Sequence, residues 1–306
     1  MSFKIEAISK EWPKVIAVVG PTASGKSALA VEIARLVEGE VVSADSRQVY
    51  TGLDIGTGKV TKKEMGRIHH HLLDVGSPKR TMSVVQYERL ATRAIHDILK
   101  LGKVPIVCGG TGLYIDAVLT TASFPEVSPN AILRKELEKL PAEKLFIKLQ
   151  KLDPARAETI DPQNPRRLIR AIEIATALGS VPLRTAPKER YDTLYIGLTP
   201  TKEVLTERIH TRLLARMRRG MVAEATRLHD AGLSWKRMES LGLEYRFLAQ
   251  FLQKKITKEK MLLDLEIAIR QYSKRQMVWF KKNKNIQWFA PEDATAILEA
   301  VKKFVK

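Results

Sequence analysis

One glycine-rich octapeptide constrains this chain more than any other segment: Gly20-Pro21-Thr22-Ala23-Ser24-Gly25-Lys26-Ser27. An apolar run, 15–19, precedes it and an apolar-rich stretch, 28–34, follows it, so the local order is strand, glycine-rich turn and helix. The spacing G-x-x-x-x-G-K-[ST] is that of a P-loop, in which backbone N–H groups and a helix N-terminus face phosphate oxygens. We therefore predict that residues 20–27 bind a di- or triphosphate, with Mg²⁺ as cofactor and the Ser27 hydroxyl as its ligand.

The charge balance indicates a polyanionic partner. Among 306 residues, 52 are basic and 34 acidic, which gives a net charge of +18. A field of that sign favours nucleic acid. The single cysteine, Cys108, excludes an internal disulfide and a cysteine-based zinc site. No apolar run is as long as a membrane span, and residues 1–6 lack the apolar part of a leader, so we expect a cytoplasmic protein without a membrane partner. We expect a monomer.

Five apolar runs alternate with helical patterns, which predicts an α/β fold. The predicted strands are 15–19, 40–43, 104–108, 191–198 and 285–289. From about residue 121 the chain becomes charge-rich and helical, and it returns to strand character near 191. We therefore predict a P-loop NTPase-like parallel sheet flanked by helices, built from 1–121 and 193–306, with a helical insertion domain at 122–192.

Two polar residues follow predicted strands at the edge of the sheet that carries the P-loop. Asp45 comes after the strand 40–43, and Thr111 lies in the turn Gly109-Gly110-Thr111-Gly112 after the strand 104–108. Ligands of parallel sheets bind at the carboxyl ends of the strands. Asp45 can therefore hold Mg²⁺ through water or accept a proton, and Thr111 can donate to a phosphate; turn capping is the structural alternative for both.

Arginines gather at two other places. Arg166, Arg167 and Arg170 lie in the first turns of a predicted helix, where they oppose its dipole, so phosphate contact explains them better than helix stability. A second row recurs every three to four residues on another helix and predicts a surface that follows a nucleic-acid backbone. This row consists of Arg208, Arg212, Arg216 and Arg219. The run 69–71 is three histidines without Cys or His partners at metal-site spacing, which we interpret as structural.

Further motifs follow the P-loop in order. They are Ser-Ala-Asp-Ser-Arg-Gln-Val-Tyr at 43–50, Gly-Leu-Asp-Ile-Gly-Thr-Gly-Lys at 52–59, His-His-Leu-Leu-Asp at 70–74, Gly-Gly-Thr-Gly-Leu-Tyr at 109–114, Asp-Pro-Gln-Asn-Pro-Arg-Arg-Leu-Ile-Arg-Ala at 161–171 and Ile-Arg-Gln-Tyr-Ser-Lys-Arg-Gln-Met-Val-Trp-Phe at 269–280. Together they cover most of the chain and resemble the bacterial form of the tRNA dimethylallyltransferase family.

The resemblance implies an activity. It implies transfer of a dimethylallyl group from dimethylallyl diphosphate to the exocyclic N6 amine of the adenosine 3′-adjacent to the anticodon in tRNA. Asp45 would be the general base on that amine, Thr22 would lie near the reacting centre, and Thr111 would contact tRNA or steady the leaving oxygen. Residues 20–27 would hold the diphosphate, with Mg²⁺ on Ser27.

The resemblance also implies a tRNA-binding set. Ser46, Arg47 and Gln48 would hold the flipped base and its neighbours. The other positions that match family contacts or the C-terminal motif are Arg134, Gln163, Asn164, Pro165, Arg166, Arg167, Arg170, Lys274, Arg275 and Gln276.

Three other functions share some of these features. A small-molecule kinase would use the P-loop for ATP, but the positive charge and the downstream motifs disfavour it. An isopentenyltransferase acting on free adenylate would not need the basic helices. A nucleic-acid-binding NTP switch would bind without prenyl transfer and without any need for Asp45.

Overall fold

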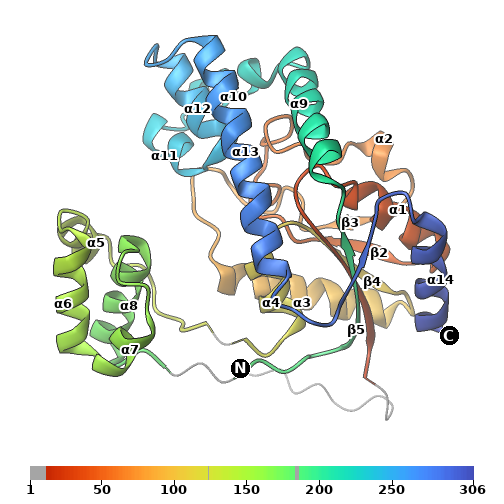
Figure 1. Ribbon diagram of the computed structural model, residues 1–306, viewed down its shortest axis with the longest axis horizontal. Helices are drawn as coiled ribbons and strands as arrows, with labels where there is room; N and C mark the ends of the chain where they lie inside the picture. Colours follow the sequence, from red (N-terminus) through yellow and green to blue (C-terminus); the bar gives the residue numbers. More distant parts are fainter. Residues whose placement is uncertain (1–11, 123, 183–185) are drawn as a thin grey trace. The chain divides into compact units, whose positions relative to one another are not determined.

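The computed structural model describes residues 12–122, 124–182 and 186–306 (Figure 1). Residues 1–6, for which the sequence predicts no leader, lie outside the described residues. The chain forms two compact units, one from the segments before and after an insertion and one from 122–188. The return to the first unit comes at Glu189, not at 193, because Glu189 forms a β-bridge with Thr120 and the Arg190 N–H donates to the Leu119 carbonyl.

A six-stranded sheet organises the first unit, in the order β3-β2-β4-β1-β5-β6, and every neighbouring pair is parallel. The strands are β1 Lys14–Val19, β2 Glu40–Ser43, β3 His70–His71, β4 Pro105–Cys108, β5 Asp192–Leu198 and β6 Ile286–Phe289. The five predicted strands are present, and the two-residue edge strand β3 was missed. The α/β prediction with a parallel sheet is confirmed.

Helices cover both faces of this sheet, as parallel connections require. Helices α1 and α14 pack on one face, and α3 and α4 pack on the other (Figure 1). The helices of the first unit are α1 Lys26–Leu36, α2 Lys62–Met65, α3 Val84–Lys100, α4 Gly112–Leu119, α9 Lys202–Arg218, α10 Met221–Asp230, α11 Trp235–Ser240, α12 Leu243–Leu252, α13 Lys258–Phe280 and α14 Ala294–Val305. No helix in the described part of the chain is long and apolar enough to span a bilayer.

The second unit is helical. It contains α5 Ala131–Leu137, α6 Ala142–Leu152, α7 Pro154–Thr159 and α8 Pro165–Leu178, packed around a small core of their own. Asn164 caps α8 by accepting a hydrogen bond from the Arg167 N–H at 3.2 Å, Pro165 is its first residue, and Gly179 ends it.

Candidate active site

The P-loop forms the turn between β1 and α1. Gly20 and Gly25 adopt φ values of +142° and +98°, which side chains rarely tolerate. A Cβ on Gly20 would lie 2.7 Å from the Leu198 carbonyl oxygen, so β5 leaves room only for glycine. Ser24 is 1% exposed, and among the described residues its Oγ has no hydrogen-bond partner. A buried hydroxyl without a partner fits a loop that is completed by phosphate oxygens.

Lys26 supplies the positive charge of this loop. Its Nζ donates to the Pro21 carbonyl at 2.5 Å. Desolvation lowers the pKa of Lys26 to about 8, and the nearby charge of Arg212 adds to this, although Cys108 and Asp45 act in the opposite direction. Burial therefore disfavours the charged ammonium, and an anion bound beside it would favour the charged form again.

Two arginines of the row on α9, Arg208 and Arg216, contact neighbouring loops. Arg208 Nη1 lies 3.5 Å from the Ser24 carbonyl oxygen. Arg216 Nη1 donates to the Gly56 carbonyl at 2.8 Å and to Glu244 Oε1 at 2.9 Å. Arg216 is thus held within the protein, with a side chain that is 12% exposed, whereas Arg212 is exposed. A backbone-following surface on the rest of this row stays a prediction. Arg219 lies beyond the helix end and is exposed.

Asp45 and Thr111 meet beside the P-loop. Asp45 is half-buried, and its Oδ1 accepts hydrogen bonds from the Arg47 and Gln48 N–H groups at 2.8 and 3.3 Å. Thr111 Oγ1 accepts from the Ser46 N–H at 3.0 Å. The turn after β2 is therefore fixed on both sides. One carboxylate oxygen orients the Asp45 side chain, and within the described part of the chain no hydrogen bond is found to the other.

Tyr272 of α13 also belongs to this group, and sequence reasoning missed it. Burial and then the charge of Asp45 raise the pKa of Tyr272 to about 12, while a hydrogen bond with Thr111 acts in the opposite direction. The phenol therefore stays protonated at neutral pH. A tyrosine inside a helical pattern carries no sequence signal for such a position.

Gln276 joins the P-loop to the turn after β4. Its Oε1 accepts from the Thr22 N–H at 2.8 Å and its Nε2 donates to the Gly110 carbonyl at 2.8 Å. Gln276 is buried, with 5% of its surface exposed. Its neighbours Lys274 and Arg275 are exposed. The C-terminal motif thus contains one buried bridging residue and two accessible cations.

Comparisons with known proteins agree on one family. The family model "IPP transferase" matches residues 48–283. The tRNA dimethylallyltransferase of Anoxybacillus flavithermus is 37% identical over 287 residues, 92% of each chain, and that of an Exiguobacterium species is 42% identical over 272 residues, 87% of each chain. The chain belongs to the IPP transferase family.

Solved structures support the same assignment for this IPP transferase. The tRNA isopentenylpyrophosphate transferase of Bacillus halodurans superposes with a TM-score of 0.73 at 35% identity, covering 95% of this chain and 96% of that one. A eukaryotic dimethylallyltransferase, solved acting on tRNA, gives a TM-score of 0.76 at 26% identity, covering 91% and 74%. Family membership makes the chain a transferase. The family resemblance predicted from the sequence motifs is confirmed.

The arginines of the helical unit of this IPP transferase fall into two classes. Arg134 donates from Nε and Nη2 to Glu173 at 2.7 and 2.8 Å, and Arg170 Nη1 lies 3.7 Å from the same carboxylate. Glu173 is 2% exposed. Arg166 and Arg167 are exposed, as are Gln163 and Pro165. The unit thus holds two of its predicted tRNA-binding arginines in an internal ion-pair network.

We expect Glu173→Gln to destabilise the helical unit by about 2–3 kcal/mol, because it leaves Arg134 without a charged partner. The value lies below that for a wholly buried pair, because the Arg134 side chain is 38% exposed. Hydrogen exchange of α5 and α8 measures the loss. Glu158→Gln, an exposed change in the same unit, is the control. Equal exchange in both variants would contradict the structural role of the network.

Proposed function

We propose that this chain transfers a dimethylallyl group from dimethylallyl diphosphate to the exocyclic N6 amine of the adenosine 3′-adjacent to the anticodon in tRNA, giving N6-isopentenyladenosine and diphosphate. The names of its relatives support the reaction class. The observation that carries the proposal is the position of the Asp45 carboxylate within electrostatic range of Lys26 and beside Thr111. A base and a diphosphate cradle thus share one site.

The P-loop side of the site suits the leaving group. In the reaction, the bond between the allylic carbon and the diphosphate oxygen breaks, and the electron pair leaves with the diphosphate. P-loop N–H groups, Lys26, Arg208 and Arg212 are placed to stabilise that charge. Thr22 lies where the P-loop meets Gln276, and we propose that it lies near the reacting carbon. Departure of the diphosphate needs no attacking water, and therefore no acidic residue to activate one. This agrees with the residues that follow β4, which are glycines and not an acid.

The residues here also fit Mg²⁺, which prefers oxygen ligands. The Ser27 hydroxyl is exposed at the start of α1, and the Asp45 carboxylate is nearby. These residues would hold the ion. When bound, Mg²⁺ supplies charge neutralisation at the diphosphate.

The Asp45 side of the site suits the nucleophile. The adenine amine is a weak nucleophile, so Asp45 accepts its proton as the new bond from N6 to the allylic carbon forms. The base must leave the anticodon-loop stack, and Ser46, Arg47 and Gln48 surround the position it would take. Tyr272 and Thr111, which interact with each other, would add two hydroxyl groups beside the bound base.

The accessible cations are the proposed tRNA contacts. Arg166 and Arg167, with Gln163, are exposed in the helical unit, and Lys274 and Arg275 are exposed on α13. Arg134, Asn164 and Arg170 act mainly by holding the helical unit together. Because the proposed substrate is tRNA, we propose that the enzyme acts in the cytoplasm. We also propose that it is active as a monomer.

Mass spectrometry of RNA tests the proposal directly. The chain is incubated with Mg²⁺, dimethylallyl diphosphate and an anticodon stem-loop that carries adenosine at the 3′-adjacent position. We expect the RNA to gain one dimethylallyl unit. A stem-loop with guanosine at that position is the control. Phosphate release from ATP without RNA modification would favour a kinase, and modification of free adenylate alone would favour the adenylate enzyme.

Gln276→Ala should lower kcat/KM for dimethylallyl diphosphate about 10- to 100-fold, because small displacements of reacting groups are costly. The variant loses both hydrogen bonds of the bridge between Thr22 and Gly110. Steady-state kinetics with each substrate varied separately measure the effect. Lys274→Ala, on the exposed side of the same motif, should instead raise KM for tRNA. If Gln276→Ala changed only KM for tRNA, the bridging role would be wrong.

A further inference from the structure

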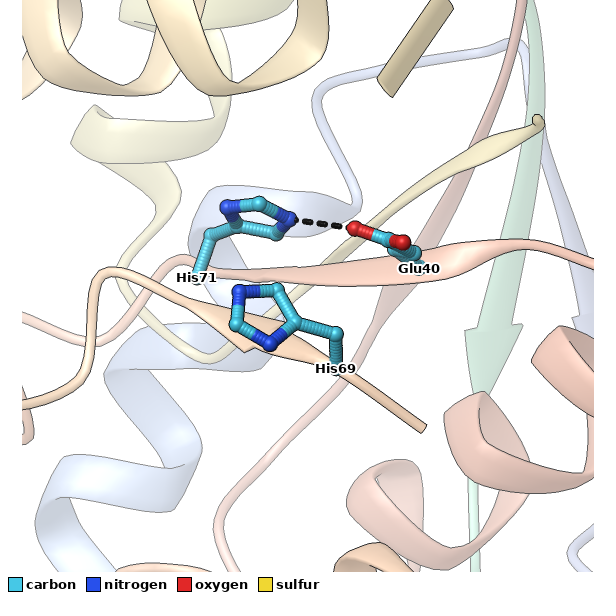
Figure 2. A group of neighbouring side chains, drawn as sticks. All are labelled: Glu40, His69 and His71. Atoms are coloured by element: carbon cyan, nitrogen blue, oxygen red, sulfur yellow. Dashed lines mark hydrogen bonds and ion pairs between the residues drawn. The ribbon is translucent and has the colours of Figure 1, made fainter. Parts of the chain in front are cut away.

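We propose that Glu40, His69 and His71 form a binding site for one divalent transition-metal ion such as Zn²⁺, separate from the active site. One ligand atom from each residue lies within 4.8 Å of the others. Figure 2 shows the His71 ring directed at the Glu40 carboxylate, with the His69 ring beside them. Sequence spacing concealed the group, because Glu40 precedes the histidines by about thirty positions and belongs to another strand.

The sheet itself brings the three side chains to one face. Strand β3 pairs in parallel with β2, with Val41 opposite His70 and Val42 opposite His71. The register places Glu40 opposite His69. Because successive side chains of a strand alternate between faces, His69 and His71 lie on one face and His70 on the other. His70 indeed bonds elsewhere, through Nδ1 to the Ile68 carbonyl at 3.0 Å.

The distances are close to those of a metal centre. His71 Nε2 lies 2.7 Å from Glu40 Oε2, and the His69 and His71 ring centroids are 4.3 Å apart. In a tetrahedral zinc site, ligand atoms lie about 3.4 Å from one another, given metal–ligand bonds of about 2.1 Å. Binding an ion therefore requires opening the Glu40–His71 contact by about 0.7 Å and moving the His69 nitrogen closer by up to about 1.4 Å, which are displacements within the range of side-chain rotation.

The surroundings also match those of a ligand set. The other Glu40 oxygen, Oε1, accepts from the Lys103 ammonium at 2.6 Å, which orients the carboxylate as outer hydrogen bonds do for metal ligands. Lys103 is 42% exposed at its side chain, so water screens its charge. Within the described residues, neither ring nitrogen of His69 has a hydrogen-bond partner, and this residue is exposed. Water can therefore reach the site and complete the coordination.

The ligand types define which ion binds and where it acts. Two imidazoles and one carboxylate select Zn²⁺, Ni²⁺ or Cu²⁺ over Mg²⁺. Glu40 begins β2 and Asp45 follows its end, so at about 3.3 Å per residue the α-carbons of the two residues are up to about 16 Å apart. The proposed ion would therefore join the edge strand β3 to β2 without contact with the diphosphate.

Calorimetric titration of Zn²⁺ into the untagged, chelator-treated protein tests this site. We expect one equivalent to bind in the presence of excess Mg²⁺, and His69→Ala to weaken binding more than tenfold. His70→Ala, the adjacent histidine on the opposite face, should leave the affinity within about twofold. Equal loss in His69→Ala and His70→Ala, or no saturable binding, would overturn the proposal.

Thermal unfolding provides a second readout and guards against misfolding. His69→Ala removes an exposed ring that makes no hydrogen bond among the described residues and only an edge contact with His71, so its Tm without metal should stay close to that of the unaltered protein. Zn²⁺ should raise the Tm of the unaltered protein but not that of His69→Ala, because only an ion bound to the folded state stabilises it. Stabilisation of both by the same amount would place the ion elsewhere.

Discussion

Asp45→Asn is expected to lower kcat for prenyl transfer by about 10³-fold, within the range that general-base catalysis contributes. The amide has the shape of the carboxylate, and its oxygen still accepts from the Arg47 and Gln48 N–H groups that fix the side chain. It cannot accept the proton of the adenine amine. The loss should therefore appear in kcat, measured in a single turnover, while binding of tRNA and dimethylallyl diphosphate stays within a few-fold.

Asp45→Ala separates the chemical role of this residue from its structural role. This variant also removes the two hydrogen bonds that hold the turn after β2, so tRNA binding should weaken in addition to kcat. If Asp45→Asn kept more than about a tenth of the activity, proton transfer to Asp45 would not limit the reaction. Such a result would reduce this residue to a turn cap.

Deprotonation of Lys26 is expected to lower kcat/KM for dimethylallyl diphosphate at basic pH. Because its pKa is lowered to about 8 in the free protein, the ammonium loses its proton above that pH, and the cradle loses a positive charge. The value of kcat/KM for dimethylallyl diphosphate should therefore be level below about pH 8 and fall up to tenfold per unit above it. The limb in kcat should lie at higher pH, because bound diphosphate stabilises the ammonium.

Two variants test the assignment of this limb. Lys26→Ala should lower kcat/KM about 10²–10³-fold at neutral pH, as for removal of one charge-stabilising donor. Lys26→Arg keeps its charge throughout this range, so its lower activity should show no fall above pH 8. A basic limb that persisted in Lys26→Arg would belong to another group.

The sequence predicts the strands well because most of them are continuous apolar runs. Strands β2 and β4 match within a residue, since buried central strands of a parallel sheet have this pattern. Strand β3 escaped prediction because His70 and His71 are two half-buried polar residues at the edge. Its pairing with β2 comes from tertiary structure and leaves no periodic signal.

Part of the candidate site could likewise be predicted from the sequence, and part could not. The proximity of Asp45 and Thr111 follows from one rule, that carboxyl ends of parallel strands share an edge. The bridge from Gln276 to Thr22 could not be predicted, because helical periodicity does not say which loop a buried amide will meet. For the same reason the arginine row on α9 identifies a basic face but does not reveal that Arg216 pairs with Glu244.

The bridge between Thr22 and Gln276 has a consequence for the timing of activity. The two residues are 254 positions apart. At about 5–20 residues per second, a ribosome needs about 13–50 s to make the intervening chain. The P-loop is therefore synthesised long before its partner exists, and a nascent chain can pair its first strands without acquiring activity. Helix α13 can dock only after most of the chain has been made, so we expect the newly made enzyme to be inactive on tRNA until Gln276 has been translated.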